Sequence, residues 1–155
     1  MIVMKVGMGV LLSVCLFSCM SSGTHGSIKC FNYTVTKIEL ETAVTKVISV
    51  SNSISQDSIK GYYNNDSIYV TIKVSESTDT NEYTFRYRGG NEYWDTSKVS
   101  CICIAYAHDK YGKGGSSGNG GVKWYDFNLK EELIGVFERG FIEEVDRELR
   151  VKHSN

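Results

Sequence analysis

The sequence predicts an α+β domain in which an antiparallel sheet of about five to seven strands is covered on one face by a C-terminal amphipathic helix. Two observations predict this class. Residues 31–107 consist mainly of short segments in which apolar and polar residues alternate, separated by turn residues. After residue 127 the apolar residues recur at helical spacing instead. A β-sandwich with a terminal helix is the alternative that the same pattern allows.

The first apolar segment, residues 38–50, fits two periods. Its apolar residues fit an alternating face, but Leu40, Val44 and Val47 also fit helical spacing. The segment is rich in threonine and valine, which restrict helical rotamers and suit a pleated surface. We therefore expect a strand here.

Later segments predict further strands. Residues 68–74 alternate in polarity, and residues 59–63 offer a hairpin partner across an Asn-Asn-Asp turn. Residues 83–87 alternate aromatic side chains with Thr and Arg. Residues 99–107 are apolar on both faces, as in a central strand, and residues 122–127 predict another short strand.

The C-terminal residues predict an amphipathic helix. Asn128 with Glu131 three residues later matches a capping box at its start. Gly135 and Gly140 each cost about 1 kcal/mol relative to alanine inside a helix. A break at Gly140 into two shorter helices therefore also fits the pattern. The apolar face consists of Leu133, Val136, Phe137, Phe141, Val145 and Leu149.

The N-terminal residues predict an export signal. Lys5 precedes an uncharged apolar stretch, residues 6–18, which is too short to span a hydrocarbon core that needs roughly 20 helical residues. A basic residue followed by a short apolar region is typical of a secretory signal. The stretch ends in Leu16-Phe17-Ser18-Cys19, which resembles the lipobox of bacterial lipoproteins. The resemblance covers residues 1–19 only, and the remainder of the chain resembles no family.

The resemblance implies that residues 1–18 are a signal peptide and that Cys19 becomes an acylated N-terminus. Several acyl chains hold a protein to a membrane almost permanently. Because Met20, and not Asp, follows the cysteine, the resemblance implies an outer-membrane lipoprotein of the bacterial envelope that faces the periplasm. Residues 19–28 predict a flexible polar tether, and residues 29–155 a single globular domain.

Charge and motifs argue against several ligands. The formal net charge is −1 at pH 7 and there is no basic cluster, so no nucleic acid partner is expected. The glycine-rich residues 112–121 lack both the Gly-Lys-Ser/Thr end of a phosphate loop and the spacing of dinucleotide-binding glycines. We therefore expect no nucleotide and no other cofactor, and predict a loop between strands at this point.

Three cysteines fall in the predicted domain, Cys30, Cys101 and Cys103. Cys101 and Cys103 lie two residues apart on a predicted strand, hence on one face, where direct pairing is sterically poor. In an oxidising envelope, Cys30 pairs with either of them and links the start of the domain to a central strand. The alternative is three buried thiols that act as small hydrophobic side chains.

The sequence predicts no catalytic and no metal site. Cys101, Cys103 and His108 lack the Cys-x-x-Cys spacing of a zinc site. A buried strand thiol is not an activated nucleophile, and no Gly-x-Ser-x-Gly elbow is present. Acidic pairs such as Asp79 with Glu82 fall in turn-rich segments, where solvated carboxylates are the norm.

Aromatic side chains are the remaining functional signal, because Tyr and Trp are enriched among the residues that dominate protein interfaces. Arg86, Arg88, Tyr93 and Trp94 flank one predicted turn and form the candidate partner-binding patch. The competing interpretation is that alternating tyrosines simply cover a two-faced sheet.

The prediction is therefore a membrane-anchored envelope lipoprotein without enzymatic activity. Its partners are the membrane, through the lipidated N-terminus, and an envelope protein. It acts either as an assembly component or as an inhibitor of the immunity type. A small envelope hydrolase or a glycan-binding domain is the alternative.

Overall fold

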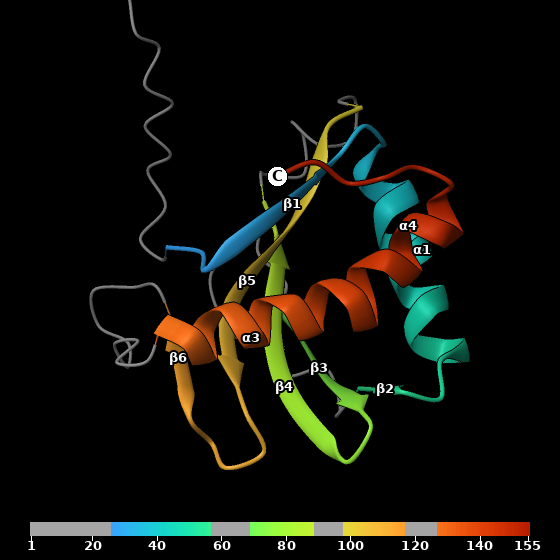
Figure 1. Ribbon diagram of the computed structural model, residues 1–155. Coiled ribbons are helices and arrows are strands. Elements are labelled where there is room, and N and C mark those ends of the chain that lie inside the picture. The colour runs from blue at the N-terminus through green and yellow to red at the C-terminus, as the bar shows by residue number, and fades with distance from the viewer. Residues whose placement is uncertain (1–25, 57–68, 89–97, 117–126) are drawn as a thin grey trace, which may run out of the picture.

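The computed structural model describes residues 26–56, 69–88, 98–116 and 127–155. In chain order the elements are β1 (Lys29–Tyr33), α1 (Lys37–Val50), β2 (Ile54–Ser55), β3 (Tyr69–Glu76), β4 (Asp79–Tyr87), β5 (Ser100–His108), β6 (Gly114–Ser116), α3 (Phe127–Phe137), the π-helical segment η1 (Glu138–Ile142) and α4 (Glu143–Leu149) (Figure 1). The predicted α+β class, an antiparallel sheet with a C-terminal helix, is confirmed. No helix within the described residues is long and apolar enough to cross a membrane.

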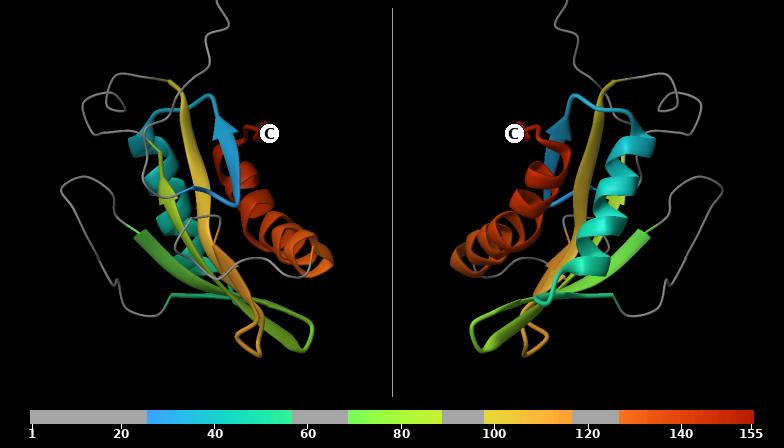
Figure 2. Two further views of the ribbon diagram at one scale, coloured as in Figure 1. Left: turned by 90° about the vertical axis from the view of Figure 1, so that its left-hand side faces the viewer. Right: turned by 90° about the vertical axis from the view of Figure 1, so that its right-hand side faces the viewer.

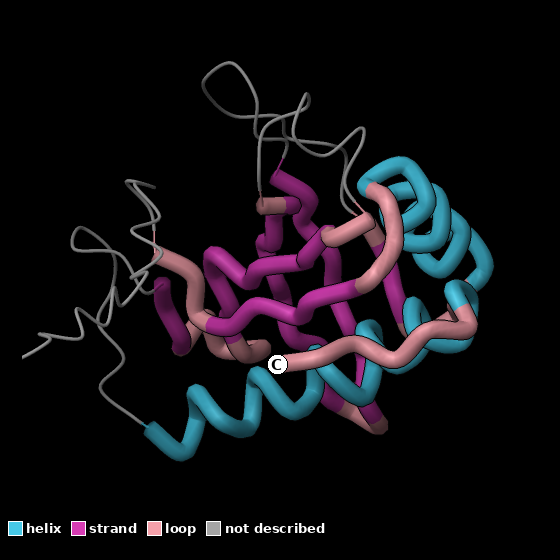
Figure 3. The backbone as a smooth tube through the Cα atoms, turned by 90° about the horizontal axis from the view of Figure 1, so that it is seen from above, coloured by secondary structure: helices cyan, strands magenta, loops and turns pink. Residues whose placement is uncertain are grey.

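The described strands form one six-stranded sheet in the order β1-β5-β4-β3-β2. All pairs are antiparallel, and β6 pairs with the later part of β5. The strand β5 is therefore central, as its apolar residues on both faces predict. Seen from above, the helices lie along one side of the sheet (Figure 3).

One hydrophobic core joins this side of the sheet to the helices. Alternate residues of the strands point into it, as the period of a β-strand requires. Figure 1 shows α3 running across the strands, and the side views of Figure 2 show the C-terminal helix beside the sheet. The largest fully buried side chains are Tyr33, Tyr83, Phe31, Phe85, Phe137, Phe141, Leu40, Ile72, Ile102, Ile104, Leu133 and Ile142.

The prediction of a strand at residues 38–50 is wrong, because these residues form the helix α1. Thr36 Oγ1 accepts a hydrogen bond from the Glu39 backbone N–H at 3.3 Å, and Glu39 Oε2 accepts one from the Thr36 N–H at 2.9 Å. This capping box satisfies two backbone donors that a helix start otherwise leaves without partners. The helix then buries Leu40, Ala43, Val44 and Val47 on one face. Tertiary burial of that face outweighs the strand preference of threonine and valine.

Four smaller predictions remain, and two of them fall wholly or mostly outside the described residues. The partner predicted for residues 68–74, residues 59–63, lies outside the described residues, and β3 pairs with β4 and β2. Most of the strand predicted at 122–127 also lies outside them, and its last residue, Phe127, begins α3. Asn128 lies inside the first turn of α3 and does not precede it. Ile28, the last residue of the predicted tether, already donates a hydrogen bond to the Ile104 carbonyl at 2.8 Å.

Gly140 does not break the C-terminal helix but lies in η1, a wider π-helical turn between α3 and α4. A Cβ atom at Gly140 would lie 2.6 Å from Cγ1 of Val74 on β3. Val74 is fully buried, so it has no free space to move into. The missing side chain of Gly140 is therefore what lets the helix approach the sheet this closely.

We expect Gly140→Ala to lower the free energy of unfolding by about 1–3 kcal/mol, because an added methyl group overpacks the core. Gly135→Ala is the matched control. Its Cβ would meet only the end of the flexible Arg139 side chain, at 3.0 Å. It should be neutral or stabilising by up to about 1 kcal/mol, the helix propensity of alanine over glycine. Urea unfolding measures both, and equal effects of the two variants would contradict the close packing on Val74.

The C-terminal residues return to the edge of β1. Ser154 and Asn32 exchange two backbone hydrogen bonds, of 2.8 and 2.9 Å. The His153 side chain is buried, with Nδ1 at 2.9 Å from Asp146 Oδ2 and Nε2 at 3.2 Å from Glu138 Oε1. Its ring also meets Phe31 edge-on, with the centroids 5.2 Å apart. The tail therefore covers part of the outer edge of β1.

Candidate functional site

A cleft of about 420 Å³ lies at one end of the sheet. Two turns, Ser77–Thr78 between β3 and β4 and Asp109–Lys113 between β5 and β6, project from that end (Figures 1 and 2). The third wall is α3. We call this hollow the end cleft; its lining is Glu76, Ser77, Thr78, Asp79, Asn81, Asp109, Lys110, Tyr111, Leu129, Glu132, Leu133 and Val136.

The described residues in the walls of the end cleft carry four carboxylates, from Glu76, Asp79, Asp109 and Glu132. Glu76 forms an ion pair with Arg139 at 3.1 Å, and Asp79 forms one with Lys110. The hydrogen bond from Lys110 holds the pKa of the Asp79 carboxyl below its usual range and raises the pKa of Lys110. Among the described lining residues, the end cleft is therefore acidic on balance, with Lys110 as the cation.

The carboxylate of Asp109 shapes the turn between β5 and β6. Its Oδ1 accepts hydrogen bonds from the backbone N–H groups of Tyr111, at 2.9 Å, and Lys113, at 2.7 Å. Asp side chains commonly fix turns in this way. The turn holds Tyr111 outward, with 74 % of its surface exposed at the mouth of the cleft. The Lys110 ammonium lies 5.2 Å from the centre of the Tyr111 ring, within the range of a cation–π contact.

The floor of the end cleft is partly apolar and firmly packed. Leu133 and Val136 of α3 are buried, and Asn81 of β4 is 8 % exposed. The Tyr83 hydroxyl donates a hydrogen bond to the Leu133 carbonyl at 2.8 Å. Burial raises the pKa of Tyr83 well above its usual range, so this hydroxyl stays a neutral donor. The contact fixes α3 to β4 directly beneath the cleft.

The predicted partner-binding patch is only partly visible. Tyr93 and Trp94 lie outside the described residues. Arg86 lies on the face of β4 that points away from the helices, opposite Tyr69 of β3. Its Nη1 donates to the Tyr69 hydroxyl at 3.4 Å, and its guanidinium carbon lies 5.9 Å from the centre of that ring. Arg88 follows β4 and is exposed, and its backbone N–H bonds to the Cys101 carbonyl at 3.4 Å.

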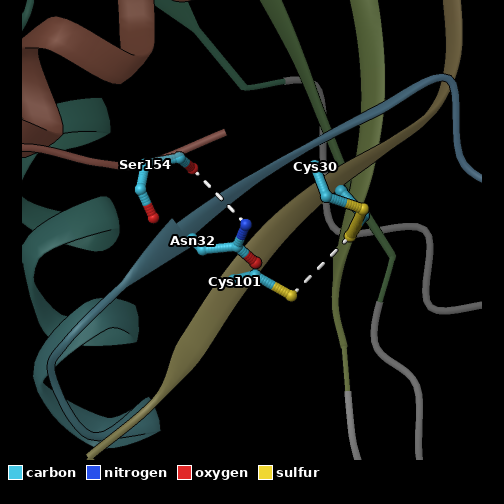
Figure 4. Close-up of a disulfide and its surroundings, with 5 residues drawn as sticks. Cys30, Asn32, Cys101 and Ser154 are labelled. Carbon is cyan, nitrogen blue, oxygen red and sulfur yellow. Dashed lines mark hydrogen bonds between the residues drawn. A yellow bond between two sulfur atoms is a disulfide. The ribbon is translucent and has the colours of Figure 1, made fainter. Parts of the chain in front are cut away.

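The three domain cysteines meet on the same outer face. Cys30 of β1 stands opposite Cys103 of β5, and their sulfurs are bonded, with the Cα atoms 4.1 Å apart. Cys101 carries a free, buried thiol, and its Sγ lies 3.8 Å from the Sγ of Cys103 (Figure 4). Burial raises the pKa of this thiol, and the nearby Arg88 and Arg86 partly oppose that effect. Cys19, the predicted acylation site, lies outside the described residues.

Metal ligation has no visible basis in this part of the chain. Among the residues that the structure describes, no three His, Cys, Asp or Glu side chains gather as a metal site requires. His108 lies at the far end of β5 from Cys101 and Cys103. His153 has both ring nitrogens directed at carboxylates, of Asp146 and Glu138, so neither nitrogen faces the end cleft or the cysteines.

Comparison with known proteins gives no relative. No family model matches the chain, and neither a curated protein nor a solved structure matches it. The function must therefore be argued from the residues themselves.

Proposed function

We propose that this chain is an outer-membrane lipoprotein of a bacterial envelope, anchored through an acylated Cys19, that binds another envelope protein and catalyses no reaction. The observation that carries the anchor is the sequence Leu16-Phe17-Ser18-Cys19 behind an uncharged apolar stretch and Lys5. Residues 19–28 are the predicted polar tether, and Ile28 at its end bonds to the Ile104 carbonyl of the sheet.

The end cleft is the surface that we assign to the partner. It combines an exposed tyrosine, an apolar floor and an acidic wall, the mixture found where a few residues dominate a protein interface. The protein itself shows which group fits there. Lys110 is held between the Asp79 carboxylate and the Tyr111 ring. A lysine or arginine of the partner finds a carboxylate of the same cleft at Glu132, with which no described residue forms an ion pair.

The contacts made by the carboxylates of the end cleft favour a binding function over glycan hydrolysis. A glycosidase needs one carboxyl group that stays protonated to act as a general acid, beside a second that is ionised. In the end cleft Glu76 and Asp79 are engaged by cations, and Asp109 accepts two backbone hydrogen bonds. For Asp79, the hydrogen bond from Lys110 lowers the pKa of the carboxyl group and so favours its ionised form. The cleft is thus better suited to attract a basic side chain than to donate a proton.

The test is a pull-down of the full-length protein from detergent-solubilised membranes, with mass spectrometry of the N-terminus. We expect an acylated Cys19 and a reproducible protein partner, and loss of membrane attachment in Cys19→Ala. Tyr111→Ala, alone and with Glu132→Lys, should lower partner recovery about tenfold or more, the effect of removing one interface hot spot.

Tyr106→Ala is the matched control, because Tyr106 is also exposed, at 41 %, but lies on the outer face of β5 opposite Thr84. It should leave partner recovery unchanged. If Tyr111→Ala, its double variant with Glu132→Lys and Tyr106→Ala all recover as much partner as the wild type, the end cleft is excluded as the binding surface. An unacylated, soluble wild-type product would exclude the anchor, whatever the partner result.

A further inference from the structure

The Cys30–Cys103 disulfide has a third sulfur in contact with it. Cys101 and Cys103 lie on the same face of β5 because they are two residues apart on one strand. Together with Cys30 they form a small cluster separate from the main core. In Figure 4, Cys101 lies beside the disulfide, and its Sγ is 3.8 Å from Sγ of Cys103. Thiol–disulfide exchange begins when a thiolate attacks a disulfide sulfur to which it has access, and this contact gives Cys101 that access.

We propose that Cys101 is a resident nucleophile for this disulfide and that the protein carries out an internal thiol–disulfide exchange. The Cys101 thiol loses its proton to solvent, and its thiolate attacks Sγ of Cys103. A Cys101–Cys103 bond forms as the Cys30–Cys103 bond breaks, and the electron pair of the broken bond leaves on Cys30. Cys30 then takes a proton from solvent. One disulfide and one thiol are present before and after, so no oxidant or reductant is consumed.

The starting arrangement is the favoured one. Residues two apart on a strand have Cα atoms about 6.6 Å apart, near the upper end of the separation that a disulfide spans. Cys30 and Cys103, by contrast, stand directly opposite each other in the register of β1 and β5. The Cys101–Cys103 isomer is therefore a minor species that forms and reverts.

The exchange changes what holds β1 to the sheet. Without the bond to Cys103, β1 is held by its backbone ladder to β5 and by the bridge from Asn32 to Ser154. The released Cys30 is only partly buried and is the second residue after the predicted tether. It becomes the thiol that is open to an external disulfide or to an alkylating reagent. The exchange needs only these three cysteines and stands whether or not the chain binds a partner.

The rate of the exchange between Cys101 and the Cys30–Cys103 disulfide should rise with pH, because the thiolate is the attacking species. Burial raises the pKa of Cys101, and the charged groups that act on it are Arg88 and Arg86, from the end of β4. On the neighbouring strand β1 it faces Asn32, which does not titrate. Below the thiol pKa, the exchange should accelerate about tenfold from about pH 7 to pH 8.

Trypsin separates the two isomers by mass. Cleavage after lysine yields residues 30–37, which carry Cys30, and residues 99–110, which carry both Cys101 and Cys103. The full-length oxidised protein is incubated with iodoacetamide, quenched and digested without reductant. We expect alkylated 30–37 together with 99–110 closed by its own disulfide, in an amount that grows with time. Alkylation traps each released Cys30, so even a minor isomer accumulates, while the buried Cys101 reacts slowly.

Cys101→Ala is the control, since it removes the nucleophile and keeps the disulfide. It should yield only the two peptides joined through Cys30 and Cys103, with no alkylated 30–37. Three outcomes would overturn the proposal. They are alkylation confined to Cys101 at all times, a joined pair linked through Cys30 and Cys101, and alkylated Cys30 in Cys101→Ala. A rate that depends on protein concentration would also do so, because it would mean exchange between molecules.

Discussion

Cys30→Ala is expected to lower the free energy of unfolding by about 4 kcal/mol, the loop-entropy effect of removing one long-range disulfide. Cys30 and Cys103 are 73 residues apart in the sequence, so their bond strongly restricts the unfolded chain. Cys30 is the informative position to replace. Its loss leaves Cys101 and Cys103 on one strand, and a bond between them would close almost no loop. Urea unfolding under non-reducing conditions measures the difference.

Two controls separate the disulfide from the side chain. Wild-type protein unfolded in excess reductant should match Cys30→Ala, because both lack the bond between β1 and β5. Cys101→Ala should change the free energy of unfolding by about 1 kcal/mol or less, since it removes one sulfur and no long-range bond. A Cys30→Ala protein as stable as the oxidised wild type would show that the bond does not form.

The central strands could be predicted because their signal is local. In β3 and β4 alternate residues are buried, and the alternation of apolar and polar residues in the sequence predicts this two-residue period. The helix α1 was missed although Thr36 and Glu39 carry a capping box that is visible in the sequence. That signal is two residues long, and the threonines and valines that follow it argued for a strand. The capping box and the burial of one face against the sheet and α4 nevertheless stabilise a helix at these residues.

Which cysteine bonds Cys30 could not be predicted, because the choice depends on the register of two strands far apart in sequence. A shift of β1 by two residues would set Cys30 opposite Cys101. Register is fixed by burial of whole faces, here by Phe31 and Tyr33 against Ile102 and Ile104. The sequence left open a bond from Cys30 to Cys101 or to Cys103, or three unbonded thiols, and the structure bonds Cys30 to Cys103.

The end cleft was not predicted for a similar reason. Its residues come from two turns and one helix, and each segment looks like ordinary turn or helix surface by itself. Asp79 was interpreted as a solvated turn carboxylate, and it is indeed exposed, but the fold brings Lys110 to it from a separate hairpin. Only Tyr111, an aromatic residue in a Gly- and Lys-containing turn, carried a local sign of an interface.

Phe137→Ala is expected to lower the free energy of unfolding by about 3–5 kcal/mol, the range for removing a buried phenylalanine ring. Phe137 is fully buried, and its ring contacts join the C-terminal helix to two strands, β1 and β4. Its ring centroid lies 5.9 Å from that of Phe31 on β1, 4.9 Å from Tyr83 and 5.9 Å from Phe85 on β4, and 5.0 Å from Phe141 on η1. No other helical residue contacts as many aromatic rings among those described.

Phe127→Ala is the control, because the same residue type at the start of α3 is 70 % exposed. It should change the free energy of unfolding by about 0.5 kcal/mol or less. Similar effects for the two phenylalanines, measured by urea unfolding, would contradict the aromatic core around Phe137.

The size of the Phe137→Ala effect also reports on the end cleft. The cost of a cavity falls when surrounding structure collapses into it. Leu133 lies about one helical turn before Phe137 on α3, and Val136 is the residue next to it. Both line the end cleft, so a collapse of α3 into the cavity would move one wall of the cleft. If the free energy of unfolding falls by about 5 kcal/mol, α3 has stayed in place, and partner recovery should be unchanged. If it falls by only about 3 kcal/mol, α3 has moved into the cavity, and partner recovery should be reduced. Measuring stability and recovery on the same variant links the core to the proposed binding surface.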